Sequence, residues 1–238
     1  MIQCALNGDF SHEDHPDVPV TLEQLVLDAR ACWEAGAASV HLHPRRAPDG
    51  IESLAADTHD AVVAAVRRAV PGLEISCSTQ KDIDTGDAAD RAQAVRGWRD
   101  PPDVVSLNLA EPGTIELGHV LLESGIGIEA GVFTVSDADA LLRAPWAELV
   151  HRVLVEVIFE HDDARAVSLA QAIDERVAGL GRPRLWHGDA RANWAVVDAG
   201  IAMGMDVRVG LEDTLFDRDG TPAPSNAEQV AQIAALLA

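Results

Sequence analysis

The sequence predicts one (β/α)8 barrel, also called a TIM barrel, that spans residues 1–238 as a single domain. The length suits a compact barrel with one substantial core better than two small domains. Short β-favouring segments alternate with amphipathic helical segments eight times, without a low-complexity linker. The alternative is an open doubly wound sheet, which usually carries a GxGxxG turn after its first strand. No such turn follows the first apolar segment here, so the closed barrel is favoured.

The eight strands are expected where short apolar segments end at polar residues or glycine. In chain order they are residues 2–6, 37–43, 73–78, 103–107, 126–132, 152–159, 184–189 and 206–209. In a barrel the carboxyl ends of all strands meet at one rim, where catalytic groups lie. The polar residues that follow these strands are therefore expected to share one site.

Helices are expected between the strands, and several carry recognisable end signals. Thr21 and Gln24 form a capping-box pattern, and Gly36 is a typical helix stop. Ser225 and Glu228 form a similar cap before the last helix, which runs to the C-terminus. The expected helices are 21–35, 57–70, 87–98, 114–124, 136–143, 164–178, 192–203 and 225–238.

The composition excludes several classes of partner. The chain carries 39 acidic and 18 basic residues, a net charge of −21 that disfavours binding to nucleic acid or to an anionic membrane. No apolar run is long enough for a membrane span, and no signal peptide is expected at the N-terminus. Three cysteines without CxxC spacing suggest reduced thiols and a cytoplasmic protein.

Two histidines at the end of the second strand form a candidate metal site. His41 and His43 are two residues apart in a strand, so both side chains point to the same face, about 7 Å from each other. Imidazole nitrogens are common ligands of zinc. An isolated HxH pattern is also compatible with two histidines that have only packing roles, so a third ligand is needed.

Glu212 offers that third ligand from the other side of the first strand. It follows the eighth strand, which neighbours the first strand in a closed barrel, as the second strand does. His41, His43 and Glu212 therefore reach the same rim, and two histidines with one carboxylate leave positions open for a substrate. Zinc suits this set best, and manganese or nickel would fit the same three residues.

Other polar residues are expected around this candidate site. Arg208 lies within the eighth strand and needs a carboxylate partner, for which Asp213 and Glu212 are the nearest candidates. Glu129 lies within the fifth strand and needs a donor or a cation for the same reason. The same rim is expected to receive Asn7, Ser78, Thr79, Ser106, Asn108 and His187. The histidines at 12, 15, 59, 119, 151 and 161 are expected at loop or surface positions.

Five motifs together give the chain a resemblance to a known family. They are HLHPR at 41–45, STQ at 78–80, SLNLAEPG at 106–113, IEAG at 128–131 and RVGLEDT at 208–214. In these motifs the chain resembles the β-keto acid cleavage enzymes, which are also known through 3-keto-5-aminohexanoate cleavage enzyme. The resemblance covers nearly the whole chain, and the combination of HxH with RxGLED is its most specific part.

The resemblance implies a zinc-bearing TIM barrel with assigned site residues. His41, His43 and Glu212 would be the metal ligands, Asp213 the general base and Arg208 its orienting partner. Glu129 would lie beside the metal site, and the carboxylate of the keto acid would bind to Ser78, Ser106 and Asn108. The family converts a β-keto acid and acetyl-CoA into acetoacetate and a shortened acyl-CoA, and its members are commonly tetrameric. A small anionic substrate and a homotetramer are therefore expected.

The substrate stays undetermined at this point, and two other functions stay open. Gln80 and Lys81 stand where many members of the family have glycines, which leaves the acyl acceptor and the keto acid undetermined. Another metal-dependent carbon–carbon lyase or hydrolase could use the same barrel. A barrel that binds a metal or a small acid without turnover is the non-enzymatic alternative.

Overall fold

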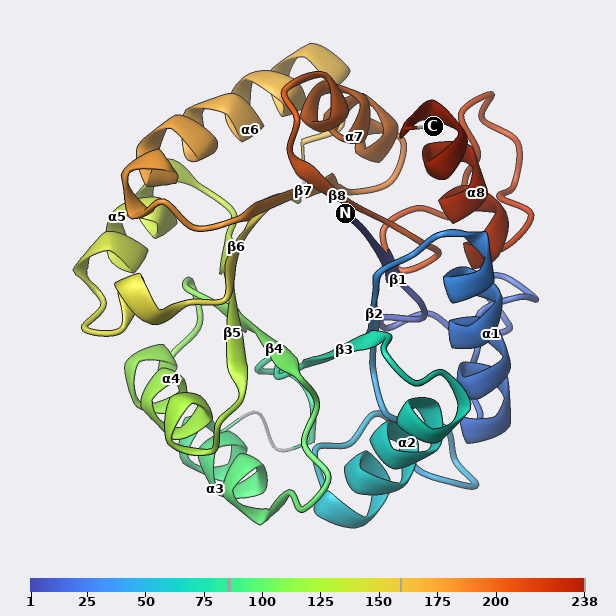
Figure 1. Ribbon diagram of the computed structural model, residues 1–238, viewed down its shortest axis with the longest axis vertical. Helices are drawn as coiled ribbons and strands as arrows, with labels where there is room; N and C mark the ends of the chain where they lie inside the picture. The colour runs from blue at the N-terminus through green and yellow to red at the C-terminus, as the bar shows by residue number, and fades with distance from the viewer. Residues whose placement is uncertain (85–86, 159, 238) are drawn as a thin grey trace.

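The structure is a computed structural model that describes residues 1–84, 87–158 and 160–237. Within these residues, parallel strands pair in chain order, and the last strand pairs with the first to close the barrel (Figure 1). The strands are β1 (Ile2–Ala5), β2 (Ser39–Leu42), β3 (Glu74–Ser78), β4 (Val104–Asn108), β5 (Gly127–Val132), β6 (Arg152–Val157), β7 (Arg184–Gly188) and β8 (Asp206–Val209). The predicted (β/α)8 fold is confirmed.

A helix follows each strand, and the helices form a ring around the barrel (Figure 1). They are α1 (Leu22–Ala35), α2 (Ala56–Ala69), α3 (Ala88–Gly97), α4 (Thr114–Glu123), α5 (Val135–Arg143), α6 (Asp163–Val177), α7 (Ala192–Ala202) and α8 (Asn226–Leu237). The capping box predicted for α1 is present, since Thr21 accepts from the backbone of Gln24 while the Gln24 side chain accepts from the backbone of Thr21. The predicted strand end at Phe159 and the last residue, Ala238, lie outside the described residues.

The alternation of side chains along each strand explains both the core and the site. Residues that point outward are apolar, for example Val40, Ile75 and Val105, and they belong to two buried clusters with apolar residues of the helices. Residues that point inward are largely polar and hydrogen-bonded to one another, as for Gln3, which donates to Glu129 at 2.8 Å. The outer face of the sheet thus stabilises the barrel, while the polar residues of its inner face can form a binding or catalytic site.

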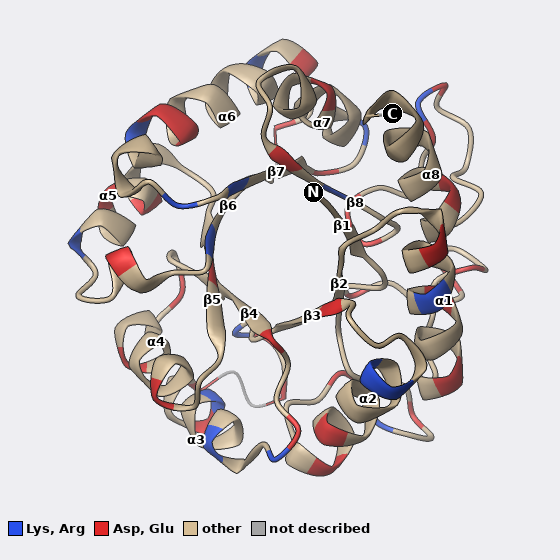
Figure 2. Cartoon of the chain, in the orientation of Figure 1, with Lys and Arg blue, Asp and Glu red and all other residues tan. Residues whose placement is uncertain are grey.

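Charged residues occur in most parts of the chain. Acidic residues are spread over the surrounding helices and loops with basic residues among them, and some charged residues lie in the barrel strands (Figure 2). Among the described residues, no helix is long and apolar enough to cross a membrane.

Candidate active site

A cavity of about 640 Å³ opens at the carboxyl ends of the strands. Its walls include eight of the nine site residues predicted from the sequence, namely His41, His43, Ser78, Ser106, Asn108, Arg208, Glu212 and Asp213. The ninth, Glu129, is fully buried below the cavity and does not line it. The closed barrel therefore brings together residues that are up to 172 positions apart in the chain, from His41 to Asp213.

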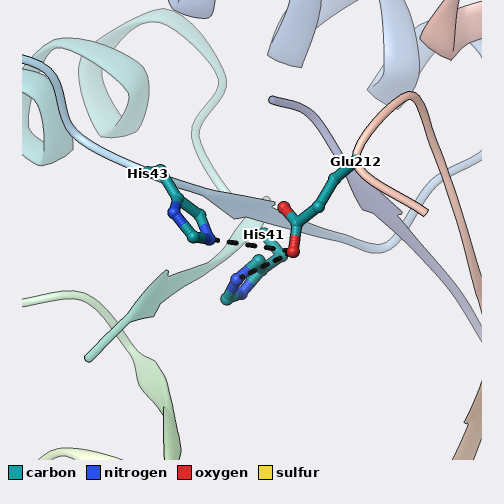
Figure 3. Close-up of side chains that lie close together, drawn as sticks. All are labelled: His41, His43 and Glu212. Carbon is teal, nitrogen blue, oxygen red and sulfur yellow. Dashed lines mark ion pairs between the residues drawn. The ribbon is translucent and has the colours of Figure 1, made fainter. Parts of the chain in front are cut away.

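The two histidines and Glu212 converge on one point (Figure 3). Glu212 Oε1 lies 3.6 Å from Nε2 of His41 and 3.7 Å from Nε2 of His43. One ligand atom of each residue lies within 4.8 Å of the others, a spacing that can hold a metal ion. The second oxygen of Glu212, Oε2, is buried and has no hydrogen-bond partner among the described residues. An unpaired buried carboxylate oxygen is costly, so this site calls for a cation.

Each histidine is held by its other ring nitrogen, which leaves Nε2 for a ligand. Nδ1 of His41 lies 2.8 Å from the hydroxyl of Ser76, which in turn donates to Glu129. Because Ser76 uses its proton on Glu129, Nδ1 of His41 is the donor in this contact. Nδ1 of His43 lies 2.8 Å from a carboxylate oxygen of Glu52, which can only accept. Carboxylates that orient metal-binding histidines in this way are a common feature of metal centres.

The pKa values of the two histidines move in opposite directions. Burial lowers the pKa of His41 to about 3, although Glu212 opposes the shift. Burial also disfavours a charged His43, but Glu212 and Glu52 outweigh it and raise its pKa to about 10. Burial likewise disfavours a charged Glu212, yet His41 and Arg208 hold its pKa well below its usual range. The carboxylates around His43 thus demand a positive charge, either a proton or a metal ion.

The backbone around Glu212 requires two glycines. At Gly210 a Cβ atom would lie only 1.9 Å from the carbonyl oxygen of Ala5, so the turn after β8 can approach β1 only without a side chain. At Gly8 a Cβ atom would lie 2.5 Å from Cγ of Glu212. His43 is fixed just past the end of β2 by Asn7, whose side chain accepts from its N–H at 2.9 Å and donates to its carbonyl at 3.0 Å.

Next to the candidate metal ligands, Arg208 holds Asp213 at two points. Nε of Arg208 donates to Oδ2 at 3.1 Å, and Nη2 donates to Oδ1 at 2.6 Å. The same Nη2 donates to Oε1 of Glu212 at 3.0 Å. Burial of Asp213 disfavours its charge, but Arg208 and His187 outweigh burial and lower its pKa. Asp213 is therefore an ionised carboxylate at neutral pH, connected through Arg208 to Glu212, one of the candidate metal ligands.

Ser78 and Ser106 lie side by side on β3 and β4, where they are paired residues in the sheet register. Both side chains are buried at the edge of the cavity. Asn108, two residues after Ser106, donates its amide N–H to Glu111 at 3.0 Å. Because Glu111 can only accept, the amide oxygen of Asn108 faces β5, where a Cβ atom on Gly131 would lie 2.5 Å from it.

Sequence comparison identifies the family to which the chain belongs. The profile of the β-keto acid cleavage enzymes matches residues 1–176 and, in a second match, residues 114–238. This chain belongs to the β-keto acid cleavage enzyme family. The resemblance seen in its motifs is therefore confirmed.

Named relatives of the family differ in the acid that their names specify. A 3-keto-5-aminohexanoate cleavage enzyme from Fusobacterium nucleatum is 27% identical over 259 residues, which cover 99% of this chain and 90% of the relative. A 3-oxoadipate:acetyl-CoA acetyltransferase from Cupriavidus necator is also 27% identical, over 99% of this chain and 87% of the relative. A 3,5-dioxohexanoate:acetyl-CoA acetone transferase from Paraburkholderia graminis is 24% identical, over 98% and 88%.

Solved structures share the barrel. The complex of ObcA with oxaloacetate aligns with a TM-score of 0.72 and 20% identity, over 93% of this chain and 64% of ObcA. The chain thus spans less than two thirds of ObcA. A type I 3-dehydroquinate dehydratase from Clostridium difficile aligns with a TM-score of 0.62 and 10% identity, over 100% of this chain and 92% of that enzyme. At these identities the likeness shows the fold alone.

Three acidic or polar residues of the site are absent from the sequence-based assignment. Glu52 contacts His43 from the loop between β2 and α2, and Ser76 links His41 to Glu129. Glu156 lies inside β6 and lines the cavity. A carboxylate in the buried segment RVLVEV is as unusual as the one that singled out Glu129, so the same argument could have found Glu156.

Proposed function

We propose that this protein is a zinc-dependent β-keto acid cleavage enzyme that condenses a β-keto acid with acetyl-CoA and releases acetoacetate and a shortened acyl-CoA. The observation that carries the proposal is the placement of His41, His43 and Glu212 directly beside the Arg208–Asp213 ion pair, in the cavity of a barrel of this family. A metal-binding group and a base on one wall are what proton removal next to a carbonyl requires.

The donor set fits zinc. Nε2 of His41, Nε2 of His43 once its proton is displaced, and an unpaired oxygen of Glu212 would form a set of nitrogen and oxygen ligands with open positions, as in catalytic zinc sites. Manganese and nickel also bind such sets. A bound zinc ion would supply a Lewis acid for the keto oxygen of the substrate and so make the C2 hydrogens more acidic.

The remaining groups would bind and deprotonate the acid. Asp213 would remove a proton from C2, and Arg208 would hold its carboxylate in the required orientation. The hydroxyls of Ser78 and Ser106 would donate to the substrate carboxylate, with Asn108 at the border of the same subsite. Glu129 would act on the site indirectly, by holding Ser76, which in turn contacts His41. Carbon–carbon bond formation with the acetyl group would precede cleavage by the CoA thiolate.

The charges around the cavity narrow the class of substrate. Acidic lining residues outnumber basic ones, with Asp9, Asp82, Glu111, Glu156, Asp189, Glu212 and Asp213 against Lys81 and Arg208. Lys81 is paired with Asp82, and Arg208 with Asp213 and Glu212, so the described lining holds no unpaired arginine or lysine for a second carboxylate. We therefore favour a β-keto acid with an uncharged or cationic acyl chain over a dicarboxylic acid such as 3-oxoadipate.

The proposal includes acetyl-CoA as co-substrate, a cytoplasmic location and a homotetrameric assembly. Acetyl-CoA is named for two of the relatives, which supports it as the acyl donor here. Cys4, Cys32 and Cys77 are buried and form no disulfide among the described residues, which suits a cytoplasmic enzyme. A homotetramer is proposed from the family resemblance.

An isotope experiment tests this function directly. The zinc-loaded protein is incubated with an unlabelled β-keto acid and with acetyl-CoA that carries ¹³C in the acetyl group. In the proposed reaction C1 and C2 of acetoacetate come from the keto acid, and C3 and C4 come from acetyl-CoA, so only the latter pair carries label. Label at other positions, or bound zinc without acetoacetate formation across a panel of keto acids, would favour another lyase or a binding protein. Asp213→Asn serves as the inactive control.

A further inference from the structure

A buried histidine links the proposed base to a second carboxylate of the cavity. His187, at the end of β7, is fully buried and does not line the cavity itself. Its Nδ1 lies 3.4 Å from Oδ1 of Asp213, and its Nε2 lies 3.5 Å from Oε2 of Glu156. Asp213 and Glu156 both line the cavity. The side chains of Arg208, Asp213, His187 and Glu156 thus form a continuous row along β8, β7 and β6.

The charges in this row alternate. Burial and the nearby Arg208 disfavour a charged His187, but Asp213 and Glu156 outweigh them and raise its pKa to about 9. The imidazole is therefore a cation at neutral pH. Its Nδ1 faces Asp213 and also lies 3.2 Å from the carbonyl oxygen of Gly188, whereas Nε2 faces Glu156 without a hydrogen bond among the described residues. Asp213 is flanked by two cations, Arg208 on one side and His187 on the other.

The two oxygens of Asp213 are not equivalent in this arrangement. Oδ1 faces both Nη2 of Arg208 and Nδ1 of His187, while Oδ2 accepts, among the described residues, only from Nε of Arg208. The His187 contact comes from β7, so it restrains rotation of a carboxylate that Arg208 holds from β8. Arg208 Nη2 is also shared with Glu212, which leaves His187 as the partner of Asp213 that is not connected to the metal ligands.

We propose that His187 is a positioning residue of the reaction, which restrains the carboxylate of Asp213 by a charge contact from Nδ1 and is itself oriented by the charge of Glu156 near Nε2. The inference rests on the proposed function, because it assigns His187 a role through the proposed base. His187 reaches no substrate in this arrangement and acts only through Asp213. The role of Glu156 is to orient the ring, and its other oxygen, Oε1, is buried without a hydrogen-bond partner among the described residues.

Two substitutions of His187 separate its two nitrogens. The amide nitrogen of asparagine can occupy the place of Nδ1, and that of glutamine the place of Nε2. His187→Asn would keep a donor for Asp213 and lose the contact with Glu156, whereas His187→Gln would do the opposite. His119→Asn, at an exposed position of α4, is the matched control.

The experiment measures kcat, KM and the rate at which the zinc-loaded enzyme exchanges the C2 hydrogens of the keto acid for deuterium. For His187→Gln we expect kcat and the exchange rate to fall together by about ten- to a hundredfold, with KM unchanged, and for His187→Asn a loss of about threefold or less. Equal rates for both variants, or a loss expressed only in KM, would overturn the positioning role. No exchange by the wild type would instead overturn the proposed function, and the positioning role with it.

A double-mutant cycle keeps the inference testable if His187→Asn folds poorly, because it needs only His187→Gln and Glu156→Gln. Glu156→Gln is isosteric and removes the charge that holds Nε2. If Glu156 acts on Asp213 only through His187, Glu156→Gln will lower kcat in the wild type and have little further effect in His187→Gln. Additive losses in the double variant would mean that the two residues act independently, which contradicts the proposal.

Discussion

Arg208 and Asp213 form a two-point ion pair at the end of β8, with donor–acceptor distances of 3.1 and 2.6 Å. Both side chains are almost fully buried, and the same guanidinium contacts Glu212. A planar guanidinium can hold a carboxylate by two parallel hydrogen bonds and so fixes its plane as well as its position. The proposed base and a proposed metal ligand therefore share one rigid partner.

Replacement of Arg208 by lysine tests whether this geometry matters beyond charge. Lysine keeps the positive charge but cannot bind both oxygens of Asp213 in one plane. We expect kcat to fall by about a hundredfold, with a smaller change in KM, because a misplaced base affects the reaction step more than binding. Steady-state kinetics with the preferred keto acid provide the measurement, and Arg68→Lys at an exposed position of α2 is the control. Wild-type kcat in Arg208→Lys would show that charge alone suffices.

The metal ligands and their supporting carboxylate should differ in how much metal they retain. His41→Ala and Glu212→Gln each remove a proposed ligand, so we expect elemental analysis to find the zinc content of both variants close to zero. Glu52→Gln leaves the ligands in place and removes only the acceptor for Nδ1 of His43, so we expect zinc affinity to fall by about ten- to a hundredfold. Glu123→Gln, exposed on α4, should bind zinc like the wild type. Full zinc content in both His41→Ala and Glu212→Gln would exclude this site.

Asp213→Asn should separate metal binding from proton removal. Asparagine is isosteric but is not a base, and the zinc ligands are unchanged, so the variant should retain zinc and lose C2 exchange. Proton NMR of the keto acid in deuterated water, without acetyl-CoA, measures the exchange rate after correction for the uncatalysed reaction. We expect a loss of at least about a hundredfold. An exchange rate equal to that of the wild type would exclude Asp213 as the base.

The sequence alone predicts the barrel, and eight of the nine residues that it assigns to the site line the cavity, for a physical reason. Period-two alternation fixes which side chains face inward, and barrel closure then brings all strand ends to one rim. His41, His43 and Arg208 follow from these two rules, and Glu212 from its place just after a strand. Glu52 does not, because it reaches His43 from a loop, where Arg45 and Glu52 form an isolated antiparallel bridge. No periodic sequence pattern predicts how this loop folds back to bring Glu52 to His43.

His187 and His59 show two further limits of pattern-based prediction. His187 was expected at the rim, but its position between two carboxylates depends on Glu156, which lies on a different strand. His59 was expected at a loop or surface position, which is wrong, since it is fully buried in α2. Its ring stacks on Trp98 with 3.7 Å between ring centroids. The partner comes from beyond the end of α3, 39 residues away, so the helical pattern of α2 alone does not reveal the contact.

The buried His59 should make the free energy of unfolding sensitive to acid. Burial lowers its pKa to about 3, and neither ring nitrogen has a hydrogen-bond partner among the described residues. In the unfolded chain its pKa is about 6.5, so between pH 6.5 and pH 3 the unfolded state binds the extra proton. The stabilisation from a neutral His59 is therefore complete above pH 6.5 and is lost progressively as the pH falls toward 3.

His59→Phe should remove this sensitivity, because phenylalanine can stack on Trp98 without binding a proton. From pH 7.5 to pH 5.0 we expect the wild type to lose about 2 kcal/mol more of its free energy of unfolding than the variant, from 1.36 kcal/mol per pH unit over about 1.5 units. Urea denaturation at both pH values measures the difference, and acidic groups common to both proteins cancel. His119→Phe, at an exposed position of α4, should keep the acid sensitivity of the wild type. Equal losses in the wild type and His59→Phe would mean that His59 accepts a proton in the folded protein as readily as in the unfolded chain.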